Sequence, residues 1–180
     1  MKKFIETERL ILREIDERDV QGIFELDSDP EVHRYLGNKP IASIEESESI
    51  IEYIMNQYKV NGIGRWAVIE KATNEFIGWA GLKYEKEVRK EMNYYDLGYR
   101  LKRKFWGKGI ATEAAIESLK YGFNSMGLEE IYAGAHINNI ASNKILRKLG
   151  FRFLETFEYD GSPHHWYKIS NLDLQKKKIA

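Results

Sequence analysis

The chain has no cysteine among its 180 residues, which excludes disulfides, thiolate metal sites and cysteine nucleophiles. It also has no net charge, because 28 lysines and arginines balance 28 aspartates and glutamates. Without an overall field to attract nucleic acid or an anionic membrane, we expect neither as a partner. No run of about 18 apolar residues occurs, and the charged start at residues 1–9 lacks the apolar stretch of a signal peptide. We therefore expect a cytoplasmic protein.

Proline is scarce as well, with three in the whole chain, while 43% of the residues are hydrophobic and 31% are charged. This balance is typical of a globular protein rather than a disordered or fibrous one. A chain of this length fits one compact domain. We expect a single domain over residues 1–180, with a core at about residues 7–172.

Apolar periodicity divides the chain into strand and helix patterns. Strands are expected at residues 7–13, 66–70, 76–82, 94–101, 131–136, 151–159 and 166–169. Helices are expected at residues 16–26, 30–36, 43–55, 110–126 and 141–149. The charged run at residues 85–91 is polar on every face and predicts a solvated loop. Because strands and helices interleave early and late around a central hairpin run, the sheet should be mixed rather than purely parallel.

A basic turn between the strand at 94–101 and the helix at 110–126 holds most of the functional information. Five cations fall within nine positions with no acid between them: Arg100, Lys102, Arg103, Lys104 and Lys108. Gly107 and Gly109 let the backbone approach a ligand closely, and the helix start supplies unpaired N–H groups at the positive end of the helix dipole. The turn predicts a phosphate site. Neither the Walker spacing nor a third Rossmann glycine is present, which disfavours both nucleotide-binding folds.

The glycine spacing in this turn resembles the pyrophosphate loop of the Gcn5-related N-acetyltransferase superfamily, on Lys104-Phe105-Trp106-Gly107-Lys108-Gly109. Three further blocks resemble the subgroup that acetylates the N-terminal alanine of ribosomal proteins. They are residues 7–13, residues 96–99 followed by 106–114, and residues 139–142 leading to 149–151. The resemblance covers residues 7 to 151.

The resemblance implies an α/β fold with a mixed, mostly antiparallel sheet of about seven strands, splayed between the fourth and fifth and flanked by about four helices. It also implies acetyl-CoA as co-substrate and no metal. Main-chain groups of Leu101 and Arg103 would bind pantetheine, and the amides from Lys104 to Gly109 would bind pyrophosphate. Asn139 would contact the coenzyme near its thioester. The expected coenzyme-binding set is Leu101, Arg103, Lys104, Trp106, Gly107, Lys108, Gly109, Ile110, Ala111 and Asn139.

Two residues are candidates for catalysis. Asp96 stands where many superfamily members have a glutamate, and its carboxylate is a candidate general base; an outward-facing or salt-bridged aspartate is the alternative. Many members protonate the leaving thiolate with a tyrosine, but Leu146 occupies that position here. Ser142 matches the serine that the ribosomal-protein subgroup is thought to place at the sulfur, with helix capping as its alternative role. Near the last hairpin, Glu158, His164 and His165 are other candidate bases.

The acceptor amine is less constrained than the acetyl donor. An α-amine, with a pKa near 8, is about a tenth neutral at pH 7, whereas a lysine is almost fully charged, so an N-terminal acceptor demands little of a base. We expect a protein N-terminus, with a polyamine, aminoglycoside or metabolite amine as alternatives. A non-catalytic coenzyme A-binding or sensing domain, and a homodimer, also stay open. Aromatic side chains expected at the acceptor site are Tyr35, Trp66, Trp79, Tyr94 and Tyr95.

Overall fold

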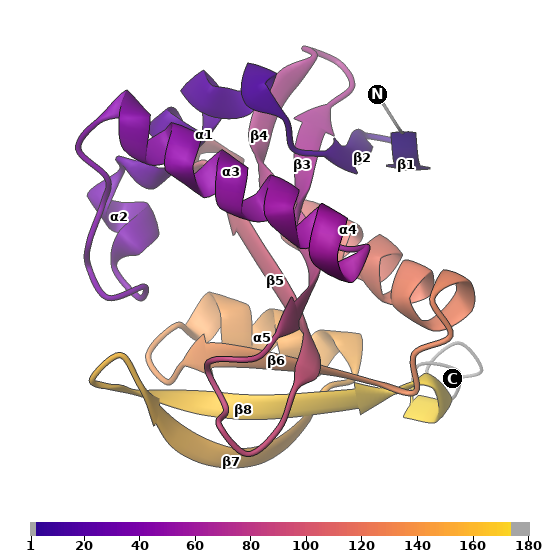
Figure 1. Cartoon of the computed structure of the whole chain (residues 1–180). Coiled ribbons are helices and arrows are strands. Elements are labelled where there is room, and N and C mark those ends of the chain that lie inside the picture. The colour runs from indigo at the N-terminus through magenta and orange to yellow at the C-terminus, as the bar shows by residue number, and fades with distance from the viewer. Residues whose placement is uncertain (1–2, 174–180) are drawn as a thin grey trace.

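The computed structural model describes residues 3–173 of the chain, and Figure 1 shows how its elements are arranged. The strands are β1 (Lys3–Glu6), β2 (Leu10–Glu14), β3 (Trp66–Glu70), β4 (Glu75–Glu85), β5 (Tyr94–Leu101), β6 (Glu130–His136), β7 (Arg152–Tyr159) and β8 (Ser162–Ser170). The α-helices are α1 (Val20–Asp27), α2 (Pro30–His33), α3 (Ile44–Asn61), α4 (Ile110–Lys120) and α5 (Ile140–Leu149). Short 3-10 turns, η1 (Glu17–Asp19) and η2 (Arg103–Phe105), precede α1 and α4, and a π-helical turn, η3 (Tyr121–Ser125), follows α4.

All of these strands form one sheet in the order β1-β2-β3-β4-β5-β6-β8-β7. Each neighbouring pair is antiparallel except β5 and β6, which are parallel. The expected mixed, mostly antiparallel α/β fold is confirmed. The sheet has eight strands rather than about seven, because the N-terminal strand β1 was not predicted. In Figure 1, β5 runs between an upper part, with β1 to β4, and a lower part, with β6 to β8.

Two hydrophobic clusters hold helices against opposite faces of the sheet. One joins the sheet to α4 and α5 through residues such as Leu82, Leu97 and Leu146. The other joins it to α1, α2 and α3 through residues such as Ile23 and Ile54. Full burial of one such side chain stabilises the fold by about 1.5–3 kcal/mol. The helices on the two faces therefore fix the sheet from both sides.

Helix boundaries follow the local sequence. The Asp29 side chain caps α2, and Asn139 caps α5 by accepting a hydrogen bond from the backbone N–H of Ser142. Gly62 and Gly150 end α3 and α5 in the left-handed conformation, with φ of 70° and 101°. The expected helix at 110–126 is regular through Lys120 and then widens into the π-helical turn.

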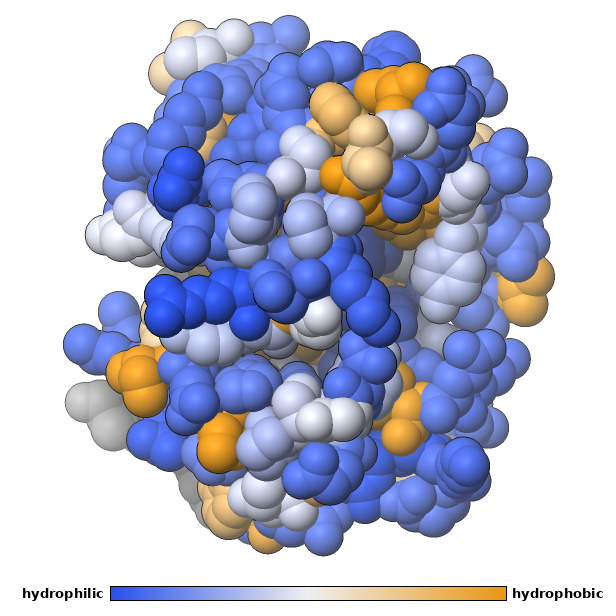
Figure 2. Space-filling view, turned by 90° about the vertical axis from the view of Figure 1, so that its left-hand side faces the viewer, coloured by the Kyte–Doolittle hydropathy of each residue, from blue (hydrophilic) through white to orange (hydrophobic). Residues whose placement is uncertain are grey.

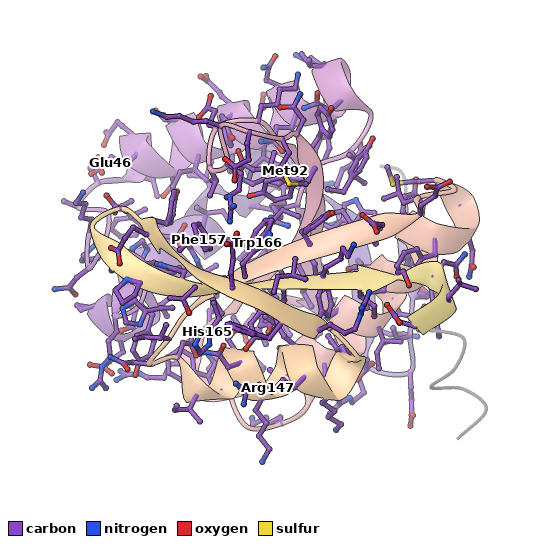
Figure 3. All side chains as sticks on the ribbon, turned by 90° about the horizontal axis from the view of Figure 1, so that it is seen from below. Glu46, Met92, Arg147, Phe157, His165 and Trp166 are labelled. Atoms are coloured by element: carbon purple, nitrogen blue, oxygen red, sulfur yellow. The ribbon has the colours of Figure 1, made fainter. Side chains whose placement is uncertain are left out.

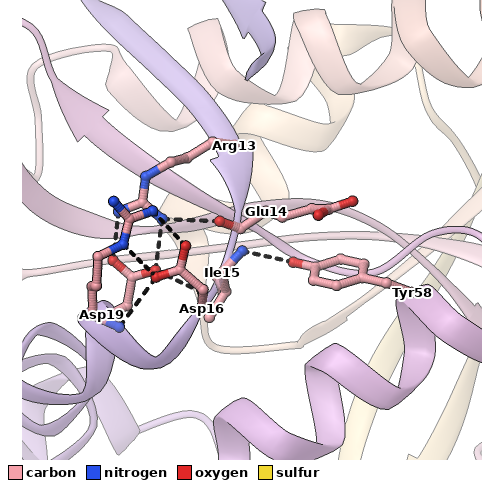
Figure 4. A network of polar contacts seen from close by, with 7 residues as sticks. Arg13, Glu14, Ile15, Asp16, Asp19 and Tyr58 are labelled. Atoms are coloured by element: carbon pink, nitrogen blue, oxygen red, sulfur yellow. Dashed lines mark hydrogen bonds and ion pairs between the residues drawn. The ribbon is translucent and has the colours of Figure 1, made fainter. Parts of the chain in front are cut away.

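A polar network ties the start of the chain to the helices that cover the sheet (Figure 4). Arg13 of β2 binds the Asp19 carboxylate through both terminal nitrogens, at 2.7 and 2.6 Å. The backbone N–H of Ile15 donates to the hydroxyl of Tyr58 on α3 at 2.9 Å. These contacts fix α1 and α3 relative to β2.

The expected solvated loop lies between β4 and β5, where Lys86, Glu87, Lys90 and Glu91 are exposed, but Arg89 of this loop is held by distant residues. Arg89 is 15% exposed at its side chain and pairs with Glu155 of β7 at 2.7 Å. Its guanidinium carbon lies 5.0 Å from the ring centre of Phe157 and 5.2 Å from that of Trp166. Figure 3 shows these two rings next to each other, on β7 and β8. These contacts hold the loop against the other half of the sheet. The sequence pattern could not show them, because the acid and the rings that Arg89 contacts are distant along the chain.

Candidate active site

The sheet opens between its two parallel strands. Asp96 and Tyr132 are the one register pair that joins β5 to β6, and β5 continues beyond that pair to Leu101. The expected splay is therefore present, and it falls between the fifth and sixth strands because β1 adds one to the count. Figure 2 shows one side of the molecule, where the surface is mainly hydrophilic and is indented at mid-height.

Tyr99 and Ser142 meet across this opening. The hydroxyl of Tyr99, on β5, lies 3.0 Å from the Oγ of Ser142 on α5 and 3.3 Å from its backbone carbonyl, to which it donates. Burial raises the pKa of Tyr99 to about 12. Asn139 caps α5 through the Ser142 N–H at 3.1 Å, so the Ser142 hydroxyl is not needed for capping. Two hydroxyl groups thus stand together at the opening.

Asn143 fixes the helix that carries Ser142. Its side-chain amide donates to the carbonyls of His136 and Asn139, at 3.0 and 2.8 Å. Its Oδ1 accepts from the Tyr167 hydroxyl at 2.7 Å and lies 2.9 Å from a ring nitrogen of His165. Asn143 is almost fully buried and was missed in the sequence, where it is one polar residue on an amphipathic helix.

The basic turn leads from the opening to the start of α4. Gly107 and Gly109 have φ of 73° and 77°, a conformation that favours glycine. Gly109 is the N-cap of α4 and has no side chain to cap the helix, so the first amides of α4 are left for a ligand. Trp106 donates its ring N–H to the Leu101 carbonyl at 2.8 Å, which holds the turn against the end of β5. Ile110 is buried beneath it.

Acids from other elements reach most of the cations of this turn. Lys102 binds Glu25 of α1 at 2.7 Å, Lys104 binds Glu75 of β4 at 2.8 Å, and Arg103 lies 3.4 Å from Asp29. Arg100 binds Asp27 at 2.7 Å. Lys108 alone among the five forms no ion pair with any residue of the described part of the chain. The sequence could not show this compensation, because the acids are 27 to 77 positions away.

One face of β4 and β5 carries a row of charged and aromatic residues on the opposite side of the sheet from Tyr99. The register places Trp79, Lys83 and Glu85 beside Arg100, Asp96 and Tyr94. Arg65 binds the Asp96 carboxylate and donates to the Asp96 carbonyl at 2.7 Å. Burial raises the pKa of Asp96 above its ordinary value, although the charges of Arg65 and Lys83 oppose the rise. We call this the Asp96 face.

The aromatic candidates separate into two groups. Trp79 lies on the Asp96 face, where its ring centre is 5.3 Å from the guanidinium carbon of Arg65 and 5.0 Å from that of Arg100. Tyr35 follows α2 and stacks near His136 at the end of β6, with ring centres 5.5 Å apart.

The other three aromatics lie elsewhere. Tyr94 is buried against Trp166, with ring centres 4.7 Å apart, so the expectation that it lines the acceptor site is corrected. Trp66 has no exposed surface and packs edge-on against Tyr121 in the cluster beneath α4, so the expectation that it lines the acceptor site is corrected. Tyr95 points to the same face as Tyr99 and pairs with Tyr84, with ring centres 5.0 Å apart. Because successive strand residues alternate between faces, Tyr95 and Asp96 point in opposite directions.

The alternative bases lie along the last hairpin. Burial lowers the pKa of His164, whose ring stands against those of His136 and Tyr159 at 5.3 and 5.6 Å. His165 faces Asn143 instead. Glu158 is exposed on β7, an edge strand. The two histidines are half-buried, and they are held by different neighbours.

A mixed sheet that opens between its parallel strands, with an uncapped, glycine-led helix beside the opening, defines an acyltransferase fold. The sequence matches the family model of the acetyltransferase (GNAT) domain over residues 9–152. The chain belongs to this family and is an N-acetyltransferase, and the family uses acetyl-CoA.

Known proteins resemble the chain over nearly its whole length. The uncharacterized N-acetyltransferase YoaA of Bacillus subtilis (strain 168) is 33% identical over 168 residues, which cover 91% of this chain and 93% of that protein. A ribosomal-protein-S5-alanine acetyltransferase from Vibrio fischeri has a TM-score of 0.74 and 22% identity, over 93% of this chain and 96% of its own. A spermidine N-acetyltransferase from Vibrio cholerae, solved with CoA and spermine, has a TM-score of 0.74 and 20% identity, over 94% and 99%.

No helix among residues 3–173 has both the length and the apolar character needed to cross a membrane. Within the same residues, no group of histidine and acidic side chains is arranged to hold a metal ion.

Proposed function

We propose that the chain transfers the acetyl group of acetyl-CoA directly to the α-amine of a protein N-terminus. The observation that carries this proposal is the charge compensation at the Asp96 face, where the carboxylates of Asp96 and Glu85, and that of Asp27 on α1 above the strands, are each paired with an arginine or lysine. Asp96 is paired with Arg65, Asp27 with Arg100 at 2.7 Å, and Glu85 with Lys83 at 2.5 Å.

The residues of the basic turn fit a coenzyme. An uncapped helix start with two left-handed glycines suits a pyrophosphate, and a Cβ at Gly107 would have open space around it, which leaves room for a ligand. The amides of Phe105 and Trp106 already donate to the carbonyls of Lys102 and Arg103, so the amides from Gly107 to Ala111 would hold the pyrophosphate, with Lys108 as the uncompensated cation. Main-chain groups of Leu101 and Arg103 would hold pantetheine along the opening, with Asn139 and Ser142 at its inner end. Acetyl-CoA supplies the activated acetyl group.

The paired carboxylates favour an acceptor with one amine. A polyamine is bound best by carboxylates whose charge is not already neutralised, whereas a single amine that must lose its proton before attack needs no such cluster. An α-amine is also closer to neutral at pH 7 than a polyamine nitrogen is. Trp79 and Tyr35 are proposed to contact the acceptor. Trp79 lies on the sheet face that α1 to α3 cover, and Tyr35 lies near His136 at the end of β6.

Asp96 is proposed as the base that receives the amine proton. It lies where the splay begins, and the burial that raises its pKa makes it a better proton acceptor. The Arg65 guanidinium opposes this by stabilising the ionised carboxylate. The pairing with Arg65 is also the alternative foreseen for this aspartate, and the two roles are separated by the pH dependence described below.

The test measures thiol release from acetyl-CoA with a panel of acceptors. We expect peptides with a free N-terminus to react with a kcat/KM at least tenfold above that of spermidine or an aminoglycoside. The same peptides with a blocked N-terminus and a free lysine serve as controls and should not react. Faster turnover of spermidine would replace this proposal with the small-amine alternative, to which the Vibrio cholerae structure lends support. Tight coenzyme binding without turnover of any acceptor would favour a non-catalytic role.

A further inference from the structure

We propose that Tyr99 positions the hydroxyl of Ser142 so that Ser142 donates a hydrogen bond to the sulfur of coenzyme A as it departs. The inference rests on the proposed acetyl transfer and on the place at the sulfur that the family resemblance implies for Ser142. What it adds is Tyr99, which holds the serine hydroxyl. Ser142 would be the residue that touches the sulfur. Tyr99 would act through Ser142.

The hydroxyl groups of Tyr99 and Ser142 form a chain in which Tyr99 donates to Ser142, and Ser142 can donate onward to the sulfur. Tyr99 donates its single hydroxyl proton toward Ser142, whose carbonyl and Oγ lie 3.3 and 3.0 Å away. When Tyr99 donates to either atom, the proton of the Ser142 hydroxyl is free to point into the opening. Among the described residues, the Ser142 hydroxyl has no other hydrogen-bond partner than Tyr99. The Ser142 hydroxyl proton can therefore be donated to an acceptor in the opening, such as the sulfur of coenzyme A.

The surroundings hold both residues in place. Tyr99 lies on the sheet face that packs against α4 and α5, next to the main cluster of hydrophobic residues. Ser142 is in the first turn of α5, which Asn139 caps and Asn143 ties to β6 and β8. The N-terminal end of a helix also favours negative charge nearby, which is the charge that develops on the sulfur.

Relative acidities decide what the pair can do. A thiol has a pKa near 8.5, burial raises that of Tyr99 to about 12, and an aliphatic hydroxyl is weaker still as an acid. Neither hydroxyl gives its proton up to a thiolate completely. The pair therefore acts as a hydrogen-bond donor: the N–C bond forms, the C–S bond breaks, and the electron pair stays on sulfur. The amine proton leaves to Asp96 or water, and Tyr99 and Ser142 keep theirs.

The pair can be tested without any acceptor, by titrating the thiol of bound coenzyme A through the ultraviolet absorbance of its thiolate. Wild-type protein should lower the pKa of the bound thiol relative to the free coenzyme. Tyr99→Phe and Ser142→Ala should each raise it again by about one unit, a tenfold change in proton affinity, because a hydrogen bond to a charged group is lost. The double variant should match Ser142→Ala, since Tyr99 acts through the serine.

Tyr84→Phe is the matched control. It removes one phenol hydroxyl from the neighbouring strand on the same face of the sheet and should leave the bound thiol unchanged. A pKa in Tyr99→Phe equal to that of the wild type, or shifts that add in the double variant, would overturn the proposal. Failure of folded wild-type protein to bind coenzyme A would instead sink the proposed function, and this inference with it. With a reacting acceptor, Tyr99→Phe should lower kcat and leave the KM for acetyl-CoA unchanged.

Discussion

The guanidinium of Arg65 occupies the space in which a side chain at position 98 would lie. A Cβ built on Gly98 would be 2.6 Å from the Nη2 of Arg65, closer than non-bonded atoms approach. The backbone of Gly98 does not require glycine, since its φ is not among the positive values. The residue is small because Arg65 must pass over it to reach Asp96.

Gly98→Ala should therefore displace Arg65 and destabilise the fold by about 1–3 kcal/mol, as overpacking typically does. Urea unfolding measures the change. Gly134→Ala on β6 is the control, because its Cβ would meet its nearest atom at an ordinary 3.7 Å, and it should cost much less. Equal stability of the two variants would contradict the account of Gly98.

Asp96→Asn should lower kcat by about 100-fold or more if Asp96 is the base. A base with a raised pKa is deprotonated only above that raised value, so wild-type activity should fall as the pH drops through it. The asparagine variant should lose this acidic limb of the profile. If the variant keeps wild-type kcat and the same limb, Asp96 serves only to hold Arg65.

Gly109→Val should weaken coenzyme A binding by at least tenfold, measured by calorimetry, because the turn before α4 can no longer adopt its left-handed conformation at little cost. Gly127→Val carries a similar backbone penalty, with φ of 67° and no atom within 4 Å of a Cβ, but lies beyond the far end of α4. Its affinity for the coenzyme should equal that of the wild type. Equal loss in both variants would point to a general effect on the fold.

Arg89→Ala should release the β4–β5 loop from β7 and β8, because it removes the ion pair with Glu155 and two ring contacts worth about 0.5–1 kcal/mol each. Amide hydrogen exchange at residues 86–93 should become faster. Lys90→Ala, at an exposed position in the same loop, should leave the exchange unchanged. Slow exchange in both variants would show that other contacts hold the loop.

Local pattern was sufficient for most of the fold. The strands at 66–70 and 94–101 lie where periodicity placed them, and the helix after the basic turn starts at Ile110 as expected. The features that the pattern did not show depend on distant partners. Strand β1 is stabilised by its pairing with β2, and the loop at 86–93 is held by residues of β7 and β8.

The sequence alone determined the family and the helix-start site beside the opening, because glycine spacing and helix termini are local properties of the backbone. Tertiary structure decided how charge and hydroxyl groups combine around that site. It placed acids from α1 and β4 against the basic turn, Arg65 on Asp96, and Tyr99 against Ser142, 43 positions away. These pairings depend on which strands and helices become neighbours in the fold. The spacing of residues along the chain does not show which elements become neighbours.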